Sequence, residues 1–222
     1  MDVRIFLQPF DVHGGLSRLG SEITGRLVSG NFNEALLFSA YVTSSGTQRL
    51  GPPLRAVIQA GGTVRALIGV HNGLTSMQAV TDLHAYGVEV WGLDTGGSIL
   101  YHPKVYALRG ANEAWVSIGS SNLTGEGMYR NIETNTILKL DLREAEERRS
   151  WDDVTRWWDR FLAAYPRNAT RIQPADVDRL QTTTKSNPAF FASNNVVPEP
   201  QNGSKTAVPG TTPKRDSIFL GI

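Results

Sequence analysis

Five polar residues with complementary chemistry lie close together in the sequence of this 222-residue chain. They are a nucleophile or proton carrier, a cation, two neutral hydrogen-bonding groups and a carboxylate, namely His102, Lys104, Ser120, Asn122 and Glu133. Cleavage of a phosphodiester builds negative charge on oxygen, so it needs fixed cations and hydrogen-bond donors. A neutral imidazole can attack phosphorus, and a neighbouring carboxylate can select its tautomer and stabilise the imidazolium. The set therefore covers every role in such a reaction except the acid that protonates the leaving oxygen.

Three predicted strands must bring these residues together. Residues 99–108, 115–119 and 131–140 are rich in branched and aromatic side chains, which is typical of strands. Because residues i and i+2 of a strand point to the same face, His102 and Lys104 are expected to project side by side. The two neutral groups follow the second strand, and the carboxylate lies near the start of the third. The ends of three strands could thus deliver all five side chains to one pocket.

Each of these motifs has an ordinary structural explanation when it stands alone. A strand with polar residues at i and i+2 is more often a solvated face, Gly-Ser-Ser-Asn is usually a turn, and a single glutamate is usually a surface carboxylate. Their occurrence together, in one order and within one segment, favours a functional site over these explanations.

The segments HPK at 102–104 and GSSN at 119–122 resemble the His-x-Lys and Gly-Ser-x-Asn signature of the phospholipase D superfamily. In its nuclease branch a glutamate follows eleven positions after the asparagine, as Glu133 follows Asn122 here. The resemblance implies that His102 is the nucleophile and forms a phosphohistidine, without a metal or another cofactor. It implies that Lys104 and Asn122 hold non-bridging phosphate oxygens, that Ser120 hydrogen-bonds within the site, and that Glu133 orients the imidazole of His102.

Three further residues are candidates for substrate binding. Members of the superfamily often carry an aspartate five positions after the lysine, where this chain has Arg109. This departure argues against the lipid-cleaving branch, and Arg109 is itself a candidate for contact with the substrate. Arg130 lies near the predicted site, and His71 follows a predicted strand end.

The chain contains a single copy of the His-x-Lys motif, because His13, His71 and His84 all lack a lysine two positions later. In the single-motif members that this chain resembles, two such motifs meet across a two-fold axis. We therefore expect a homodimer with a shared site, in which the second His102 is the missing acid.

The formal net charge is only +1, so a nucleic-acid partner would have to be bound by a local basic patch. The candidate arginines are Arg49, Arg55, Arg65, Arg109 and Arg130, each of which is individually more often an ordinary solvated residue. The sequence favours a metal-independent DNA endonuclease. A lipid phosphodiesterase and a non-catalytic nucleic-acid-binding module remain alternatives, and restriction, defence and repair are all compatible settings.

Strands and helices alternate in the first half of the chain, which predicts an α/β fold with a mixed sheet flanked by helices on both faces. In residues 143–165, aromatic side chains recur at helical spacing, which favours core packing over a subunit interface. Besides the three strands above, strands are expected at 3–7, 34–42, 63–70 and 88–93. Helices are expected at 16–28, 47–60, 75–86, 143–165 and 174–180. Pro52 and Pro53 are expected to open or interrupt the second of these helices, and Thr75 to cap the third.

Composition divides the chain into a catalytic domain at residues 1–180 and a Pro-, Ser-, Thr- and Asn-rich tail or linker at 181–222. The apolar residues 217–222 could form a docking segment or begin a further domain. There is no cysteine, which excludes disulfides and thiolate metal sites and fits a reducing cytoplasm. No apolar run of about 18 residues exists, so no membrane span is expected.

Overall fold

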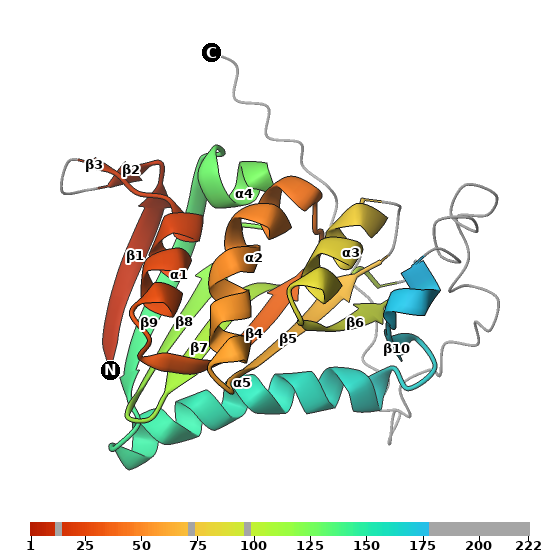
Figure 1. Cartoon of the computed structure of the whole chain (residues 1–222). Coiled ribbons are helices and arrows are strands. Elements are labelled where there is room, and N and C mark those ends of the chain that lie inside the picture. Colours follow the sequence, from red (N-terminus) through yellow and green to blue (C-terminus); the bar gives the residue numbers. More distant parts are fainter. Residues whose placement is uncertain (12–14, 71–73, 96–98, 178–222) are drawn as a thin grey trace, which may run out of the picture.

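A computed structural model describes residues 1–11, 15–70, 74–95 and 99–177. Its main feature is a mixed sheet with the strand order β1-β9-β8-β7-β4-β5-β6-β10 (Figure 1). The central strands β4, β5 and β6 are parallel, and every other pair of neighbours is antiparallel. The strands are β1 (Asp2–Gln8), β4 (Phe32–Ser39), β5 (Thr63–Gly69), β6 (Glu89–Leu93), β7 (Lys104–Gly110), β8 (Glu113–Gly119), β9 (Glu133–Asp141) and β10 (Ala169–Arg171), and β2 (Phe10–Asp11) pairs separately with β3 (Gly15–Leu16).

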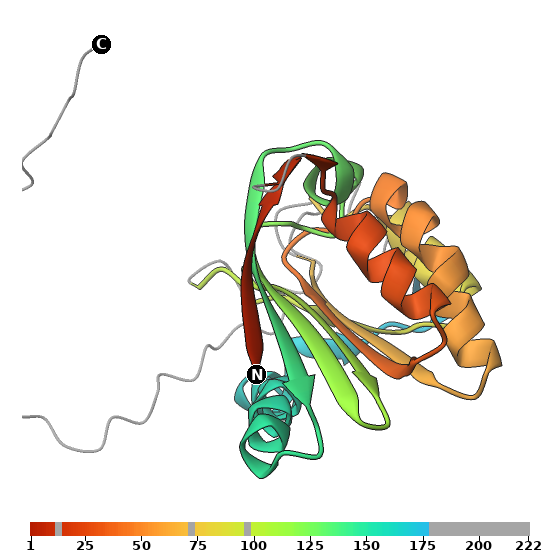
Figure 2. The same cartoon turned by 90° about the vertical axis from the view of Figure 1, so that its left-hand side faces the viewer.

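Helices cover both faces of this sheet, as predicted. One face carries α1 (Leu19–Val28), α2 (Ser44–Gln59), α3 (Met77–Ala85) and the short α4 (Gly125–Tyr129), and the other carries α5 (Ala145–Ala164) (Figure 2). The buried apolar residues accordingly form two clusters, one between the sheet and the first group of helices and one between the sheet and α5.

The aromatic stripe of α5 is mainly core. Trp151, Val154 and Trp158 recur at helical spacing and are buried, while Trp157 on the same helix is partly exposed. Phe38 of β4 packs edge-on against Trp158, with ring centroids 5.8 Å apart. The stripe therefore attaches α5 to the middle of the sheet.

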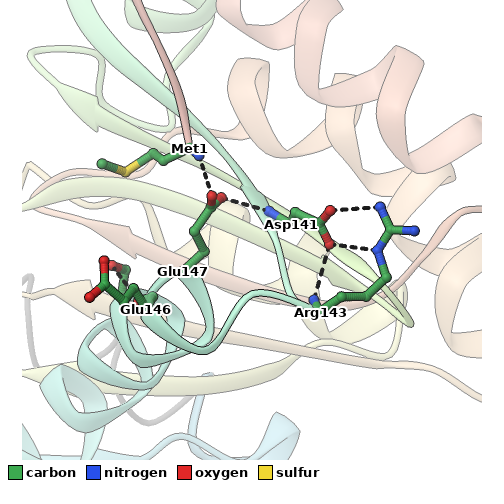
Figure 3. Close-up of polar contacts among 6 residues, drawn as sticks. Met1, Asp141, Arg143, Glu146 and Glu147 are labelled. Carbon is green, nitrogen blue, oxygen red and sulfur yellow. Dashed lines mark hydrogen bonds and ion pairs between the residues drawn. The ribbon is translucent and has the colours of Figure 1, made fainter.

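The start of α5 is also fixed by a polar cluster at the end of β9 (Figure 3). Arg143 donates its backbone N–H and Nε–H to Asp141 Oδ1 and its Nη2–H to Oδ2, over 3.0, 2.8 and 2.6 Å. These bonds hold the pKa of Asp141 at about 2. Glu147 of α5 accepts the backbone N–H of Asp141 at 2.8 Å and also contacts the α-amino group of Met1. The cluster joins the start of β1, the end of β9 and the first turn of α5.

Several element boundaries differ from the predictions. The helix predicted at 47–60 begins at Ser44 and continues through Pro52 and Pro53. The two prolines cannot donate backbone hydrogen bonds, and the packing of the buried side chains of the helix offsets this loss. Ser76 takes the N-cap position of α3, while the Thr75 hydroxyl donates to the carbonyl of Gly69. Residues 174–177 are helical, as expected, and the rest of that helix and the tail 181–222 lie outside the described residues.

No helix in the described ranges combines the length and apolar composition needed to cross a membrane.

Candidate active site

The predicted site residues gather at one end of three adjacent antiparallel strands. Lys104 begins β7, Ser120 directly follows β8, and Glu133 begins β9. The register pairs Val105 with Ile118 and Gly119 with Asn135, so these three ends lie at the same edge of the sheet. Antiparallel pairing therefore places residues from distant parts of the sequence beside each other.

The strand predicted at 99–108 begins only at Lys104, so His102 lies in the approach to β7. Pro103 lacks a backbone N–H and cannot donate to a ladder, although its carbonyl accepts from the N–H of Ala40 at 2.9 Å. The apolar residues before it made the segment resemble a strand. The predicted proximity of His102 and Lys104 is nevertheless observed.

His102 and Lys104 form the chemical centre of the site. Lys104 Nζ lies 2.6 Å from His102 Nδ1 and 2.8 Å from Nε2, and it donates to the His102 carbonyl at 3.1 Å. The lysine is only 6% exposed, whereas the histidine is exposed. Burial, and then the charge of Lys104, lower the pKa of His102. The ring is therefore predominantly neutral at pH 7, with one ring nitrogen able to act as a nucleophile.

Asn122 is positioned by Tyr41, which follows β4. The backbone N–H of Tyr41 donates to Asn122 Oδ1 at 3.2 Å, which leaves the Nδ2 amino group of Asn122 as the donor for a ligand. The ring of Tyr41 also meets the ring of His102 edge-on, with centroids 5.8 Å apart and planes at 74°. Tyr41 thus links the histidine to the asparagine, a role that no local signal in the sequence predicted.

The buried Ser39 joins the two loops that carry these residues. Its Oγ–H donates to the Tyr41 carbonyl at 2.7 Å, and its oxygen accepts the Leu123 N–H at 2.9 Å. Two glycines allow helices to approach the same loop closely. A Cβ at Gly46 of α2 would lie 2.5 Å from the Leu123 carbonyl oxygen, and one at Gly127 of α4 would lie 2.6 Å from the carbonyl oxygen of Asn122. The loop at 120–124 is therefore fixed from several sides.

Glu133 is held by neutral partners. The Ser120 hydroxyl donates to Glu133 Oε2, Asn131 Nδ2 donates to Oε1 at 3.1 Å, and the Thr134 N–H donates to Ser120 Oγ at 3.1 Å. Among the described residues, no hydrogen bond joins Glu133 to His102, the contact that the resemblance implied. The carboxylate acts instead on Lys104: burial lowers the pKa of Lys104, and the charge of Glu133 opposes that shift. Glu133 thereby favours the charged ammonium beside His102.

The additional candidates for substrate binding are placed differently. Arg109 lies near the opposite end of β7 from Lys104, pairs with Glu34 at 3.8 Å and stacks on Trp151, so the structure does not bring it to the site. Arg130 follows α4, beside Asn131, and forms an exposed ion pair with Glu126 at 3.5 Å. His71 lies outside the described residues.

The remaining arginines of the expected basic patch are spread over different elements. Arg49 stacks on Tyr129 at 4.6 Å, Arg55 on Tyr86 at 5.1 Å and Arg65 on Trp158 at 4.9 Å. Arg49 and Arg55 belong to α2, whereas Arg65 faces α5 on the other side of the sheet. They do not form a single patch with Arg109 and Arg130.

Within the described residues, no group of three or more His, Asp and Glu side chains is arranged to hold a metal ion. Among the five candidate site residues, the fixed positive charge is that of Lys104.

No protein-family model matches this chain, and no curated protein matches its sequence. Solved structures share its fold. A phospholipase D family member, Nuc from Salmonella typhimurium, is 15% identical with a TM-score of 0.54, over 78% of this chain and 99% of that one. NucT from Helicobacter pylori is 13% identical with a TM-score of 0.51, over 77% and 99%. Phosphatidylserine synthase from Haemophilus influenzae Rd KW20 is 11% identical with a TM-score of 0.50, over 83% and 45%. The chain therefore has the phospholipase D-like fold that the motifs predicted.

Proposed function

We propose that this protein is a hydrolase of phosphodiester bonds that uses His102 as its nucleophile. The observation that carries the proposal is the pairing of an exposed imidazole with a nearly buried ammonium group, with 2.6 Å between Lys104 Nζ and His102 Nδ1. A phosphate bound at Lys104 would lie next to the imidazole, and the ammonium would stabilise the charge that builds on the phosphate oxygens.

The reaction would consist of two displacements at phosphorus. A neutral ring nitrogen of His102 attacks the phosphate, the bond to the leaving oxygen breaks, and that oxygen takes a proton from an acid. Water then attacks the phosphohistidine, restores the imidazole and releases a phosphomonoester. Lys104 and the Nδ2 group of Asn122 would hold the non-bridging oxygens through both steps. Ser120 and Glu133 support Lys104 and the geometry of the pocket.

We favour DNA as the substrate and endonucleolytic cleavage as the reaction. The support is the resemblance to the nuclease branch, in which the glutamate stands eleven positions after the asparagine, as Glu133 does here.

A lipid phosphodiesterase is the second candidate, because apolar side chains are exposed beside the site. Leu100 is two residues before His102, Ile132 is one residue before Glu133, and both are exposed.

The test is hydrolysis of bis-p-nitrophenyl phosphate, followed by assays on plasmid DNA, single-stranded DNA, RNA and phosphatidylcholine. His102→Ala should abolish turnover without unfolding the protein, since the side chain is exposed. Lys104→Met should reduce it strongly, while Lys139→Met, at an exposed lysine on β9, should leave it unchanged. Turnover at the wild-type rate by pure His102→Ala would refute the nucleophile.

We also propose that the working enzyme is a homodimer in which the second His102 supplies the acid. One imidazole must be neutral and one protonated, so the pH–rate profile should be bell-shaped. Mixing wild-type and His102→Ala subunits should give inactive heterodimers, and a phosphate analogue should bind once per dimer. A fully active monomer, or two independent phosphate sites per dimer, would contradict the shared site.

A further inference from the structure

Asn135 is a buried amide close to the candidate active site. It lies on β9 two residues after Glu133, so both side chains point to the face of the sheet that α1 to α4 cover, as does the core residue Ile137 (Figure 2). Its side chain is only 1% exposed. Burying an amide costs free energy unless its polar atoms are bound. Its contacts therefore indicate what this residue contributes.

The amide spans the segment 119–121, with Ser120 in the middle. The Nδ2 group of Asn135 donates to the buried Ser121 Oγ at 2.9 Å. Its Oδ1 lies over Gly119, where a Cβ would come within 2.3 Å of that oxygen. Gly119 is not among the described glycines with a positive φ. This glycine is therefore required by the close approach of β9 and its Asn135 amide, rather than by the backbone conformation.

Ser120, between these two contacts, holds the carboxylate of the site. Its backbone N–H donates to the Thr134 carbonyl at 3.0 Å, and its hydroxyl donates to Glu133 Oε2. The charge of Glu133 in turn opposes the effect of burial on the pKa of Lys104. A displacement of residues 119–121 would move Ser120, and with it the carboxylate that supports the ammonium group.

Ser121 is bound from two strands. Tyr106 of β7 donates its hydroxyl to the Ser121 carbonyl at 2.9 Å, and Asn135 of β9 binds the Ser121 side chain. Ser117 is also fully buried on the same face of β8, but its hydroxyl has no hydrogen-bond partner among the described residues. The two serines therefore differ in one respect that matters here, which is the bond from the Asn135 amide.

We propose that Asn135 is a positioning residue for the reaction: its amide fixes residues 119–121 and thereby the Ser120 hydroxyl that holds Glu133. The inference rests on the proposed function, in which Glu133 supports Lys104. Asn135 does not touch the substrate, because it is buried and acts through Ser120 and Glu133.

The first test is the kcat of purified variants with bis-p-nitrophenyl phosphate. Asn135→Leu keeps the approximate volume of the side chain and removes both polar atoms. Its kcat should fall roughly 10-fold, which is the rate equivalent of one hydrogen bond. Ser121→Ala removes the same bond by a smaller change, so it should give a similar loss even if Asn135→Leu does not fold. Ser117→Ala is the matched control and should keep the wild-type kcat.

A double-mutant cycle with Glu133→Gln separates positioning from a general loss of folded protein. If the Asn135–Ser121 bond acts through Glu133, Ser121→Ala should lower kcat little further once the charge of Glu133 has been removed. A purely structural role would lower kcat by the same factor in both backgrounds, and that result would overturn the proposal.

The outcomes also separate this inference from the proposed function. Wild-type turnover by His102→Ala would refute the proposed function and the inference with it. If His102→Ala is inactive and Glu133→Gln is slowed, while Ser121→Ala keeps the wild-type kcat, the proposed function stands and Asn135 is not a positioning residue.

Discussion

Ser39→Ala should destabilise the protein and slow catalysis although Ser39 does not reach the substrate pocket. The side chain is fully buried, and its hydroxyl satisfies both the Tyr41 carbonyl at 2.7 Å and the Leu123 N–H at 2.9 Å. Each buried polar group left without a partner costs roughly 1–3 kcal/mol. The bond to the Leu123 N–H is buried and the bond to the Tyr41 carbonyl is partly buried, so the two together give a loss of about 3 kcal/mol in the free energy of unfolding. For a chain of this length, that corresponds to a decrease in Tm of about 6–12 °C.

The measurement is urea unfolding and thermal melting of Ser39→Ala beside Ser29→Ala. Ser29 makes the same two kinds of bond on the surface: its Oγ–H donates to the Arg26 carbonyl at 2.7 Å, and its oxygen accepts the Asn31 N–H at 3.4 Å. Water can replace those bonds, so Ser29→Ala should change stability by less than about 0.5 kcal/mol. Turnover of bis-p-nitrophenyl phosphate should fall only in Ser39→Ala, because Tyr41 and Asn122 lose their common support. Equal stability of the two variants would refute the reasoning.

Three further results are expected. Burial, and then the charge of Lys104, lower the pKa of His102 below its usual 6.5. Because the attack needs the neutral ring, the pH below which kcat/KM falls should lie below 6.5. Lys104→Met removes the second cause and should move the NMR titration of His102 upward; no movement would exclude the coupling. Glu133→Gln should lower kcat roughly 10- to 100-fold by removing the charge that supports Lys104, whereas Glu113→Gln at the exposed start of β8 should not. Cleavage should persist in excess EDTA, and complete loss restored by magnesium would contradict the mechanism.

Much of the fold was predictable because its elements have clear periods. The strands at 3–7, 63–70 and 88–93 and the helix at 143–165 are observed within a few residues of the predicted boundaries. Their apolar residues repeat at two or at three to four positions, and that spacing is set by the backbone.

The segment that leads into β7 was not predictable in the same way. Tyr101 is apolar enough to suggest a strand, but it is buried by tertiary contacts, and its hydroxyl donates to the Leu67 carbonyl at 3.0 Å. Period alone cannot distinguish a strand residue from an irregular segment that packs into the core.

The five candidate site residues could be chosen from the sequence because their types and order match the needs of phosphodiester cleavage, and the structure places them at one end of β7, β8 and β9, while their roles stay a prediction. The residues that support them could not be chosen in this way. Ser39 and Tyr41 reach Leu123 and Asn122 across more than 80 positions of sequence, and a buried serine after an apolar strand has no distinguishing pattern. Arg109 was a reasonable candidate by charge, and only the register of β7 shows that it lies near the strand's other end.

The close approach of two helices to the loop at 120–124 affects how this protein can vary. A library of single substitutions selected for turnover should lose variants at Gly46 and Gly127 about as completely as at His102, although a glycine offers no group for the reaction. A Cβ at either position would collide with the backbone of Leu123 or Asn122. The residues that cannot be replaced therefore include some that take no part in the proposed reaction. Neutral drift in α2 and α4 is limited by the packing around one loop. Mutational sensitivity alone would therefore overestimate the number of residues that take part in the proposed reaction.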